Sequence, residues 1–295
     1  MTTTRATEWY AAPAGAVSRP AAEPATVLDF LAGRRLVVLT GAGLSTDSGI
    51  PDYRGPLAPS RRPMTYQEFV SGRAPRQRYW ARSHLGWGRM SAVAPNPGHR
   101  ALAALDPELL ITQNVDGLHE VAGSRRMVAL HGRIAEVVCL GCRATSPRQA
   151  LQAELERLNP GWAARHAAVA SRPDGDVELD DTGDFVVPDC PACGGILKPD
   201  VVFFGENVPA PRVERCYAAV DALGPDDALL VAGSSLTVMS GLRFVRRAAK
   251  AGVPVVVVNR GATRGDELAA YTMHAGCSEF LTQLAGRRVS RGPAR

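Results

Sequence analysis

Two pairs of cysteines carry the clearest chemical signal in this sequence. Cys139 and Cys142 form one Cys-x-x-Cys pair, and Cys190 and Cys193 form another. Two such pairs are typical of a tetrahedral zinc site, and four cysteine ligands leave no open coordination position. The alternative is two unrelated redox pairs, but neither pair opens a helix in a βαβ unit, as a redox motif does. We therefore predict one structural Zn²⁺ bound by Cys139, Cys142, Cys190 and Cys193.

A second signal lies in a glycine-rich segment near the N-terminus. The apolar run Leu36–Leu39 is followed by Gly41, Gly43 and the hydroxyl of Ser45. Glycine permits positive φ and lets backbone N–H groups approach a pyrophosphate closely, so the segment predicts a dinucleotide phosphate site. The third glycine, Gly49, comes later than in the fingerprint of nicotinamide dehydrogenases, which argues against that class.

Charged and aromatic residues follow the glycine segment directly. Pro51, Asp52, Tyr53 and Arg54 place an acid, an aromatic ring and a base beside the predicted phosphate site. The simpler interpretation is an exposed loop in which Asp52 and Arg54 pair with each other.

A third group of polar residues follows a second apolar run, Leu109–Thr112. Gln113, Asn114 and Asp116 come directly after this run, and His131 follows further along. Short amides and carboxylates at the end of a strand bind polar ligands or cap the next helix. Histidine titrates near neutral pH and can act as a general base, but a lone histidine after an apolar residue is more often a structural residue.

Composition excludes several other classes of protein. The 295 residues are 45% hydrophobic, and the net charge of +5 (34 basic minus 29 acidic residues) is spread along the chain. This charge does not indicate nucleic-acid binding. No apolar stretch reaches the roughly 18 residues of a membrane span, and the start lacks a secretory signal. We expect a cytoplasmic protein, with a transit peptide as the lesser alternative.

Positioning these groups requires a parallel sheet. Buried strands are predicted at Leu36–Leu39, Leu109–Thr112, Ala228–Ala232 and Val253–Val258, each followed by small polar residues, with crossover helices at Pro97–Leu105 and Val213–Leu223. Ligands of open parallel sheets bind at the carboxyl ends of the strands, so these four ends predict one crevice. The fold class is therefore α/β, a Rossmann-like doubly wound parallel sheet with a smaller zinc-binding module formed by insertions.

The same pattern divides the chain into regions. Residues 26–59, 95–138 and 196–286 form the predicted nucleotide-binding domain, and residues 60–94 and 139–195 form a small helical and zinc-binding module. Residues 1–25 and 287–295 are expected to be a flexible leader and tail.

Several separate segments together resemble one protein family. GAGLSTDSGIPDYRG at 41–55, TQNVDGLH at 112–119, LHG at 130–132, KPDVVFFGE at 198–206, GSS at 233–235 and NRG at 259–261 are similar, in order, to the signatures of the sirtuins. The resemblance runs from about residue 27 to about residue 284. It implies an NAD-dependent protein-lysine deacylase that consumes NAD as a co-substrate and acts on acyl-lysine proteins or peptides.

The resemblance also implies residue roles. His131 matches the catalytic base, Asn114 and Asp116 match catalytic residues that hold the nicotinamide amide and the ribose, and His119 falls in a turn where a structural role is expected. The implied NAD-binding residues are Gly41, Ala42, Gly43, Ser45, Pro51, Asp52, Tyr53, Arg54, Gln113, Asn114, Asp116, Gly233, Ser234, Ser235, Asn259, Arg260, Gly261 and Cys277.

The resemblance is less specific about the acyl group. Val201, Val202 and Phe203 match the edge that pairs with an extended acyl-lysine peptide. Tyr79 and Arg82 match a pair that binds the carboxylate of succinyl-lysine in one branch, although Arg82 can equally be a surface cation. The long segment between the cysteine pairs resembles class II sirtuins, the branch of the fourth mammalian sirtuin.

Two alternatives to deacylation stay open. A protein mono-ADP-ribosyltransferase would use the same NAD site, and a nonenzymatic NAD-binding scaffold would use the zinc module for assembly. We expect a monomer with no nucleic-acid or membrane partner.

Overall fold

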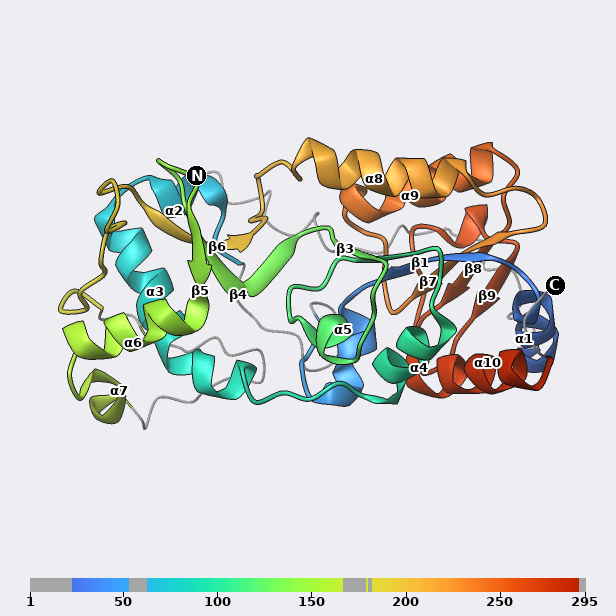
Figure 1. Cartoon of the computed structure of the whole chain (residues 1–295), viewed down its shortest axis with the longest axis horizontal. Coiled ribbons are helices and arrows are strands. Elements are labelled where there is room, and N and C mark those ends of the chain that lie inside the picture. Colours follow the sequence, from blue (N-terminus) through green and yellow to red (C-terminus); the bar gives the residue numbers. More distant parts are fainter. Residues whose placement is uncertain (1–22, 53–62, 167–178, 180–181, 292–295) are drawn as a thin grey trace, which may run out of the picture.

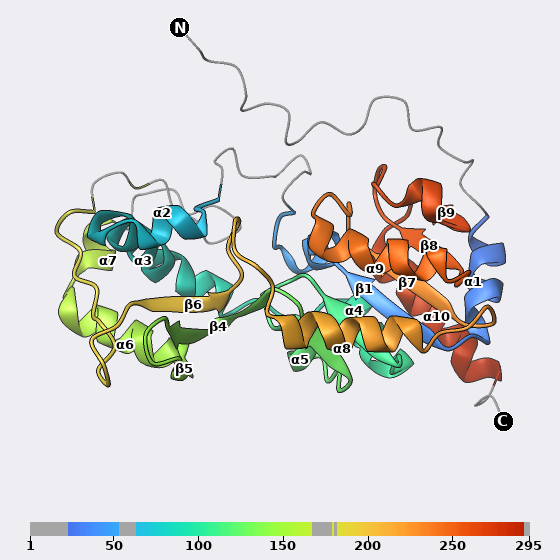
Figure 2. The same cartoon turned by 90° about the horizontal axis from the view of Figure 1, so that it is seen from above.

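The computed structural model describes residues 23–52, 63–166, 179 and 182–291. Within these ranges the strands form two sheets, one in each of two lobes that lie side by side (Figures 1 and 2). The larger sheet has the order β3-β2-β1-β7-β8-β9, and every pairing in it is parallel. Its strands are β1 (Leu36–Thr40), β2 (Leu109–Thr112), β3 (Met127–Ala129), β7 (Ala228–Ala232), β8 (Val255–Val258) and β9 (Tyr271–Met273). The predicted Rossmann-like sheet is confirmed.

Alternating side chains of the buried strands build two cores, one on each face of this sheet. Leu36 and Val38 of β1 pack into one core with α1, α4 and α10, whereas Val37 and Leu39 pack into the other with α8 and α9. A strand points successive side chains to opposite faces, so a continuous apolar run is needed when both faces are covered. Figure 1 shows α8 and α9 on one side of the sheet and α4 and α10 on the other.

The helices and 3₁₀ turns connect and cover these strands. They are α1 (Pro24–Ala32), η1 (Ala42–Ser48), α2 (Tyr66–Val70), α3 (Arg73–Met90), α4 (Pro97–Leu105), α5 (Leu118–Val121), α6 (Arg148–Leu158), α7 (Trp162–Arg165), α8 (Ala210–Asp221), α9 (Met239–Lys250), η2 (Asp266–Leu268) and α10 (Cys277–Arg291). None of the helices in the described ranges has the length and apolar character that a membrane span requires.

The bounds of α4 coincide with the predicted helix because its capping residues are local. The side chain of Asn96 accepts from the backbone N–H of His99, His99 bonds back to the Asn96 backbone, and Pro97 occupies the first helical position. These interactions satisfy N–H groups that the first turn of a helix leaves without a partner.

The smaller lobe contains the second sheet, in the order β5-β4-β6, with antiparallel pairing. Its strands are β4 (Gly132–Cys139), β5 (Thr145–Pro147) and β6 (Leu197–Val201). Aromatic side chains from α2, α3, α7 and the following segment fill its core, including Phe69, Trp80, Trp162 and Phe185. Strand β4 extends from the larger lobe into the smaller one (Figure 2). It therefore connects the edge of the parallel sheet to the cysteine pairs.

The structure differs from the sequence-based expectations at several boundaries. Helix α10 continues past Gly286 to Arg291, into the stretch predicted as a flexible tail, because Phe280, Leu281 and Leu284 anchor it in the core. Helix α1 begins at Pro24, inside the predicted leader, whereas residues 1–22 and 292–295 lie outside the described residues. Strands β3 and β9 were not predicted, since three residues each are too few to show a period.

Candidate active site

Four strands of the parallel sheet end at the same level and bring their following loops together. Thr40, the last residue of β1, is paired with Thr112 at the end of β2 and with Ala232 at the end of β7. Ala232 is in turn paired with Val258 at the end of β8. The segments that start at residues 41, 113, 233 and 259 therefore share one edge of the sheet, where open parallel sheets bind their ligands.

Gly41 and Gly43 are needed here for a reason that differs from the sequence-based one. Neither is among the glycines with positive φ, and Gly41 is extended, with φ −137°. A Cβ on Gly41 would lie 2.8 Å from the carbonyl oxygen of Gly233, and one on Gly43 would lie 2.9 Å from the same atom. The two loops are therefore packed backbone to backbone. The absent side chains permit this packing, and neither residue adopts the positive φ that glycine permits.

Ser45, Asn114 and Asp116 form a hydrogen-bonded cluster behind these loops. The Ser45 hydroxyl donates to Asp116 Oδ2 at 2.7 Å and accepts from Asn114 Nδ2 at 3.0 Å. The same amide also donates to the carbonyl of Gly41 at 3.1 Å. Asp116 Oδ1 accepts from the backbone N–H of Leu118, two residues on, at 3.0 Å, as in an Asx turn. Asp116 is therefore not the N-cap of α5, which is Gly117, and its other carboxylate oxygen belongs to the cluster with Ser45.

Burial disfavours the charge of Asp116. Burial raises the pKa of its carboxyl group, while the hydrogen bonds from Leu118 and Ser45 oppose that shift because they favour the carboxylate. A carboxyl group with a raised pKa in such a cluster is a common property of functional sites.

His131 lies at the start of β4 and has a hydrogen bond at each ring nitrogen. Nδ1 is 2.9 Å from the carbonyl oxygen of Gln113, and Nε2 is 2.8 Å from the hydroxyl of Ser240. A carbonyl oxygen can only accept, so Nδ1 carries the proton and Nε2 of the neutral ring has the free lone pair. Burial and, to a smaller degree, the charge of Arg212 lower the pKa of His131 to about 4, although the hydrogen bond to the Gln113 carbonyl opposes this shift. The ring is therefore neutral at pH 7, the state that a general base requires.

Gln113 connects His131 to the phosphate-side loops. Its backbone N–H donates to the carbonyl of Thr40 at 2.9 Å, and its side-chain Oε1 accepts from the hydroxyl of Ser234 at 2.6 Å. One residue thus contacts the ends of β1 and β7 and also orients the histidine.

His119 is in a structural position. Its ring is almost completely buried, Nε2 is 3.0 Å from Thr40 Oγ1, and its ring centroid is 4.8 Å from that of His99. Burial lowers the pKa of His119 to about 3 and that of His99 to about 4. His119 is therefore enclosed in the core beside α4.

The remaining predicted cofactor residues lie around the same edge or outside the described residues. Ala42 lies in η1, Gly233, Ser234 and Ser235 follow β7, and Asn259, Arg260 and Gly261 follow β8, where the Asn259 amide donates to the carbonyls of Arg260 and Gly261. Cys277 starts α10, and Pro51 and Asp52 end the described part of the first loop. Tyr53 and Arg54 lie outside the described residues.

The predicted peptide-binding edge lies next to the histidine. The backbone N–H of Val202 donates to the carbonyl of His131 at 2.8 Å, and Val201 is paired with Gly132. In the described sheet, β6 pairs with β4 and has no strand on its other side. Strand β6 ends at Val201, so Val202 and Phe203 of the predicted edge lie just after it, where Glu206 Oε2 accepts the N–H of Phe203 and the Phe204 carbonyl accepts from Tyr66.

Tyr79 and Arg82 extend from α3 toward different neighbours. The Tyr79 ring lies 5.3 Å from that of Phe203, so it borders the peptide edge. Arg82, one turn later, donates through Nε and Nη2 to the carbonyl oxygen of Leu179, at 3.2 and 2.9 Å. Phe203 connects Tyr79 to the predicted edge, whereas Arg82 binds the backbone of Leu179.

The four predicted zinc ligands converge at the far end of β4 and β6. Their sulfur atoms all lie within 4.8 Å of one another, with 3.5 Å between Cys139 and Cys193 and 3.8 Å between Cys142 and Cys190. Tetrahedral coordination with Zn–S distances near 2.3 Å requires sulfur separations of roughly 3.8 Å. The four cysteines could therefore hold one zinc ion, and their all-sulfur donor set fits a closed structural site.

Glycines allow the two cysteine turns to approach the same point. A Cβ on Gly195 would lie 2.9 Å from the sulfur of Cys139, and one on Gly141 would lie 3.3 Å from that of Cys193. Backbone N–H groups, first that of Cys142, lower the pKa of the Cys139 thiol to about 6, which favours the thiolate that binds metal.

Comparison with known proteins agrees with this arrangement. Residues 41–240 match the family described as the Sir2 family. An NAD-dependent protein deacetylase 1 of Mycobacterium avium (strain 104) is 54% identical over 90% of this chain and 95% of the relative. An NAD-dependent protein deacetylase of Xanthomonas axonopodis pv. citri (strain 306) is 52% identical over 90% of this chain and 92% of the relative. The chain belongs to the Sir2 family.

Solved structures of Sir2 proteins share the fold. One, described as Sir2 with a p53 peptide and NAD+, is 29% identical and superimposes with a TM-score of 0.72, covering 90% of this chain and 98% of the other. The sirtuin resemblance is thus confirmed at the level of the family.

Several residues of this Sir2 site were not found by sequence reasoning. Ser240 contacts the histidine across 109 positions of sequence, and Arg212 pairs with Asp200 at 2.9 Å beside Gly132. Buried Lys198 pairs with Glu206 at 3.1 Å below the peptide edge. The contact of Ser240 has no local sequence signal, because it joins elements distant in the chain, whereas Lys198, Asp200 and Glu206 lie within the segment 198–206 but their partners could not be assigned from it.

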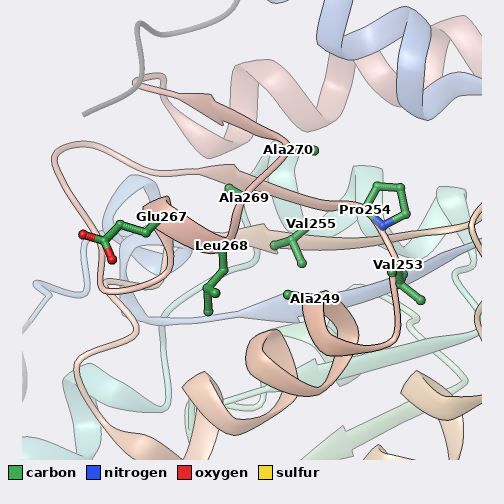
Figure 3. Close-up of a pocket in the computed structure, with 9 residues that line it drawn as sticks. Ala249, Val253, Pro254, Val255, Glu267, Leu268, Ala269 and Ala270 are labelled. Carbon is green, nitrogen blue, oxygen red and sulfur yellow. The ribbon is translucent and has the colours of Figure 1, made fainter. Parts of the chain in front are cut away.

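A hollow of about 370 Å³ lies at the opposite end of the sheet from this site (Figure 3). It is lined by residues that precede or begin β8, including Val253, Pro254 and Val255, together with Leu268 and Ala269. The polar loops that follow the strands do not contribute to it, so it is separate from the Sir2 site.

Proposed function

We propose that this Sir2-family chain is an NAD-dependent protein-lysine deacylase, which transfers the acyl group of an acyl-lysine to ADP-ribose and releases nicotinamide. The observation that carries the proposal is His131, held as a neutral base with its lone pair at Nε2, next to the predicted peptide edge and connected through Gln113 to the strand ends. The relatives named NAD-dependent protein deacetylase support the reaction, and the Sir2 structure with a peptide and NAD+ supports the pair of substrates.

The reaction first breaks the bond between nicotinamide and its ribose. The acyl oxygen of the modified lysine attacks the anomeric carbon, and nicotinamide leaves with the electron pair of the broken bond. A ribose hydroxyl then attacks the resulting imidate carbon and gives its proton to Nε2 of His131. Water completes the release of the lysine amine and leaves the acyl group on ADP-ribose.

Asn114 and Asp116 prepare the nicotinamide end of the site. Ser45 and the Gly41 carbonyl hold the two side chains in one orientation, so they present an amide and a carboxyl group without reorganisation when the co-substrate arrives. The cofactor-binding set further includes Gly41, Ala42, Gly43, Pro51, Asp52, Tyr53, Arg54, Gln113, Gly233, Ser234, Ser235, Asn259, Arg260, Gly261 and Cys277.

The peptide extends along the free edge of β6, with Val201, Val202 and Phe203 as its main-chain and side-chain partners. The open edge of β6 and the hydrogen bond between Val202 and the His131 carbonyl support this placement, since they put the edge next to the base. Tyr79 contributes a wall of the acyl pocket through its contact with Phe203.

For the acyl group, we place the chain in the class II branch and assign Arg82 to the recognition of an acyl carboxylate. The long segment between the cysteine pairs supports the branch. The position of Arg82 one helical turn after Tyr79 supports its assignment. A guanidinium binds a carboxylate through two parallel hydrogen bonds.

The zinc ion, when bound to the four cysteines, joins the ends of β4 and β6 and takes no part in the chemistry. Four reduced thiols in one site support a reducing compartment, the cytoplasm. We further propose that the protein acts as a monomer on protein substrates, without nucleic-acid or membrane partners.

The function is tested by nicotinamide release from NAD with and without acyl-lysine peptides. Release should increase with a peptide. Because His131 acts after nicotinamide has left, His131→Ala should release at most about one nicotinamide per chain and form no free lysine, whereas the matched variant His274→Ala, at an exposed histidine, should keep multiple turnover. If no peptide accelerates release, the deacylase proposal is wrong. Transfer of labelled ADP-ribose to protein would favour the transferase alternative.

The acyl preference is tested by turnover of acetyl, succinyl, glutaryl, branched dicarboxylic and lipoyl peptides. Arg82→Met should lower turnover of the carboxylate-bearing chains selectively. Arg73→Met, at an exposed position of the same helix, is the control. Equal turnover profiles for wild type and Arg82→Met would show that Arg82 does not recognise the acyl carboxylate.

A further inference from the structure

Ser240 is a polar residue that the proposed reaction does not yet use. It is the second residue of α9, and its hydroxyl lies 2.8 Å from Nε2 of His131. A serine at a helix start commonly bonds to the backbone of its own first turn. The N-cap residue of α9, Val238, makes no side-chain cap, and the hydroxyl of Ser240 is directed at the histidine instead.

The direction of the hydrogen bond follows from the other side of the ring. Because the Gln113 carbonyl requires a proton on Nδ1, the neutral ring has a single lone pair, at Nε2, and Ser240 must donate to it. A hydroxyl has one donor and two acceptor sites and turns about its Cβ–Oγ bond. The same oxygen can therefore accept from Nε2–H once the ring has taken a proton.

Close packing of α9 brings Ser240 to this position. A Cβ on the next residue, Gly241, would lie 2.8 Å from Nε2 of the Gln113 side chain, and Leu242 is anchored in the core at 1% exposure. Gly241 thus lets the helix start contact the residue whose carbonyl holds the opposite side of the imidazole. The ring is fixed between α9 and the end of β2.

The charges around His131 oppose its protonation, so the Ser240 hydroxyl is important as an acceptor for the protonated ring. Among the described residues, the charged side chain that shifts the pKa of His131 is Arg212 of α8, whose positive charge opposes a positive ring. Arg212 is itself paired with Asp200 of β6. The start of α9 carries the positive end of the helix dipole and also opposes protonation. The other contacts of His131 are neutral. They are the backbone carbonyl of Gln113, directly after β2, and the backbone N–H of Val202, directly after β6.

We propose that Ser240 is a positioning residue for His131, which donates to the neutral ring at rest and accepts from the ring after it has taken the proton of the substrate hydroxyl. In this step the substrate O–H bond breaks, the Nε2–H bond forms, and the serine keeps its own proton by rotation. The protonated ring then has an acceptor at both nitrogens, Gln113 and Ser240. This inference rests on the role of His131 in the proposed function.

The test compares Ser240→Ala, Ser240→Thr and the control Ser91→Ala, which removes an exposed hydroxyl at the end of α3. A hydrogen bond to a charged group is worth about tenfold or more in an equilibrium or rate. We expect kcat to fall about tenfold or more in Ser240→Ala. We expect an unchanged KM for NAD, recovery in Ser240→Thr and no effect in Ser91→Ala.

A second readout does not depend on turnover. Nitrogen-15 NMR of the His131 ring reports which nitrogen carries the proton and at what pH the ring titrates. In Ser240→Ala we expect the pKa of His131 to fall further, because the charged ring loses its acceptor. An unchanged titration together with an unchanged kcat would overturn the inference, as would a change confined to the KM for NAD. If no variant, wild type included, turns over peptide while the titration shifts as expected, the proposed function fails and the positioning contact stands.

Discussion

Two serines of the same 3₁₀ turn provide the sharpest prediction for this site. Ser45 Oγ donates to Asp116 and accepts from Asn114, and the residue is 1% exposed. Ser48 lies three positions later in η1, and its Oγ is buried with no hydrogen-bond partner in the part of the chain that the structure describes. Replacing each with alanine removes one oxygen from nearly the same surroundings.

The magnitudes of the two changes should differ strongly. Ser45→Ala leaves a buried carboxylate oxygen without its donor and removes one acceptor of the Asn114 amide. A bond to a charged group contributes about 1.5–3 kcal/mol and a neutral one about 0.5–1.5 kcal/mol, so unfolding should become easier by about 2–4 kcal/mol. Ser48→Ala removes an unsatisfied hydroxyl, and its effect should lie within about 0.5 kcal/mol or be stabilising.

Urea unfolding followed by tryptophan fluorescence measures the stability of both variants. Calorimetry with NAD measures their affinity for NAD. We expect Ser45→Ala to weaken NAD binding about tenfold or more, since Asn114 and Asp116 lose their common anchor. Ser48→Ala should bind NAD as the wild type does. Equal losses of stability in the two variants would refute the reasoning, because they would show that the hydrogen bonds of Ser45 contribute nothing beyond its volume.

Three further predictions concern other parts of the molecule. Chelation should release one zinc ion per chain and raise amide exchange in β4 and β6 together, whereas full protection of metal-free protein would contradict a role in joining these strands. Gly41→Ala should raise the Kd for NAD at least about tenfold, because its Cβ would clash with the backbone of Gly233. The control Gly33→Ala, whose Cβ has open space, should leave the Kd unchanged, and calorimetry measures both. His119 has a pKa lowered to about 3 by burial, so the unfolded chain binds its proton more readily and stability is lost as pH falls from about 6.5 toward 3. His119→Gln should reduce the slope of unfolding free energy with pH by up to about 1.4 kcal/mol per unit, and an unchanged slope would assign it elsewhere.

Much of this fold was predictable because its determinants are local. The apolar runs at β1, β2 and β7 have no polar residue until their ends, and a strand covered on both faces requires that pattern. The start of α4 is local, since Asn96 and His99 bond to each other within four residues and Pro97 occupies the first helical position. The short strands β3 and β9 were missed because their pairing depends on neighbours far along the chain.

The candidate site divides in the same way. Sequence alone determined the cysteine pairs, the histidine and the polar residues after the strands, because residue type and spacing fix which chemistry is available. It could not decide which atoms of these residues meet. Gly41 showed the limit, since its role depends on the loop after β7, whose approach no local rule describes.

Only the tertiary structure decided the state of the candidate catalytic groups. A proton is fixed on Nδ1 of His131 because the carbonyl of Gln113, directly after β2, faces it, and Nε2 meets a hydroxyl because Gly241 lets α9 come close. Orientation, burial and pKa are set by contacts between distant segments. The sequence determined which chemical groups this Sir2 protein has, and packing determined how each of them is oriented.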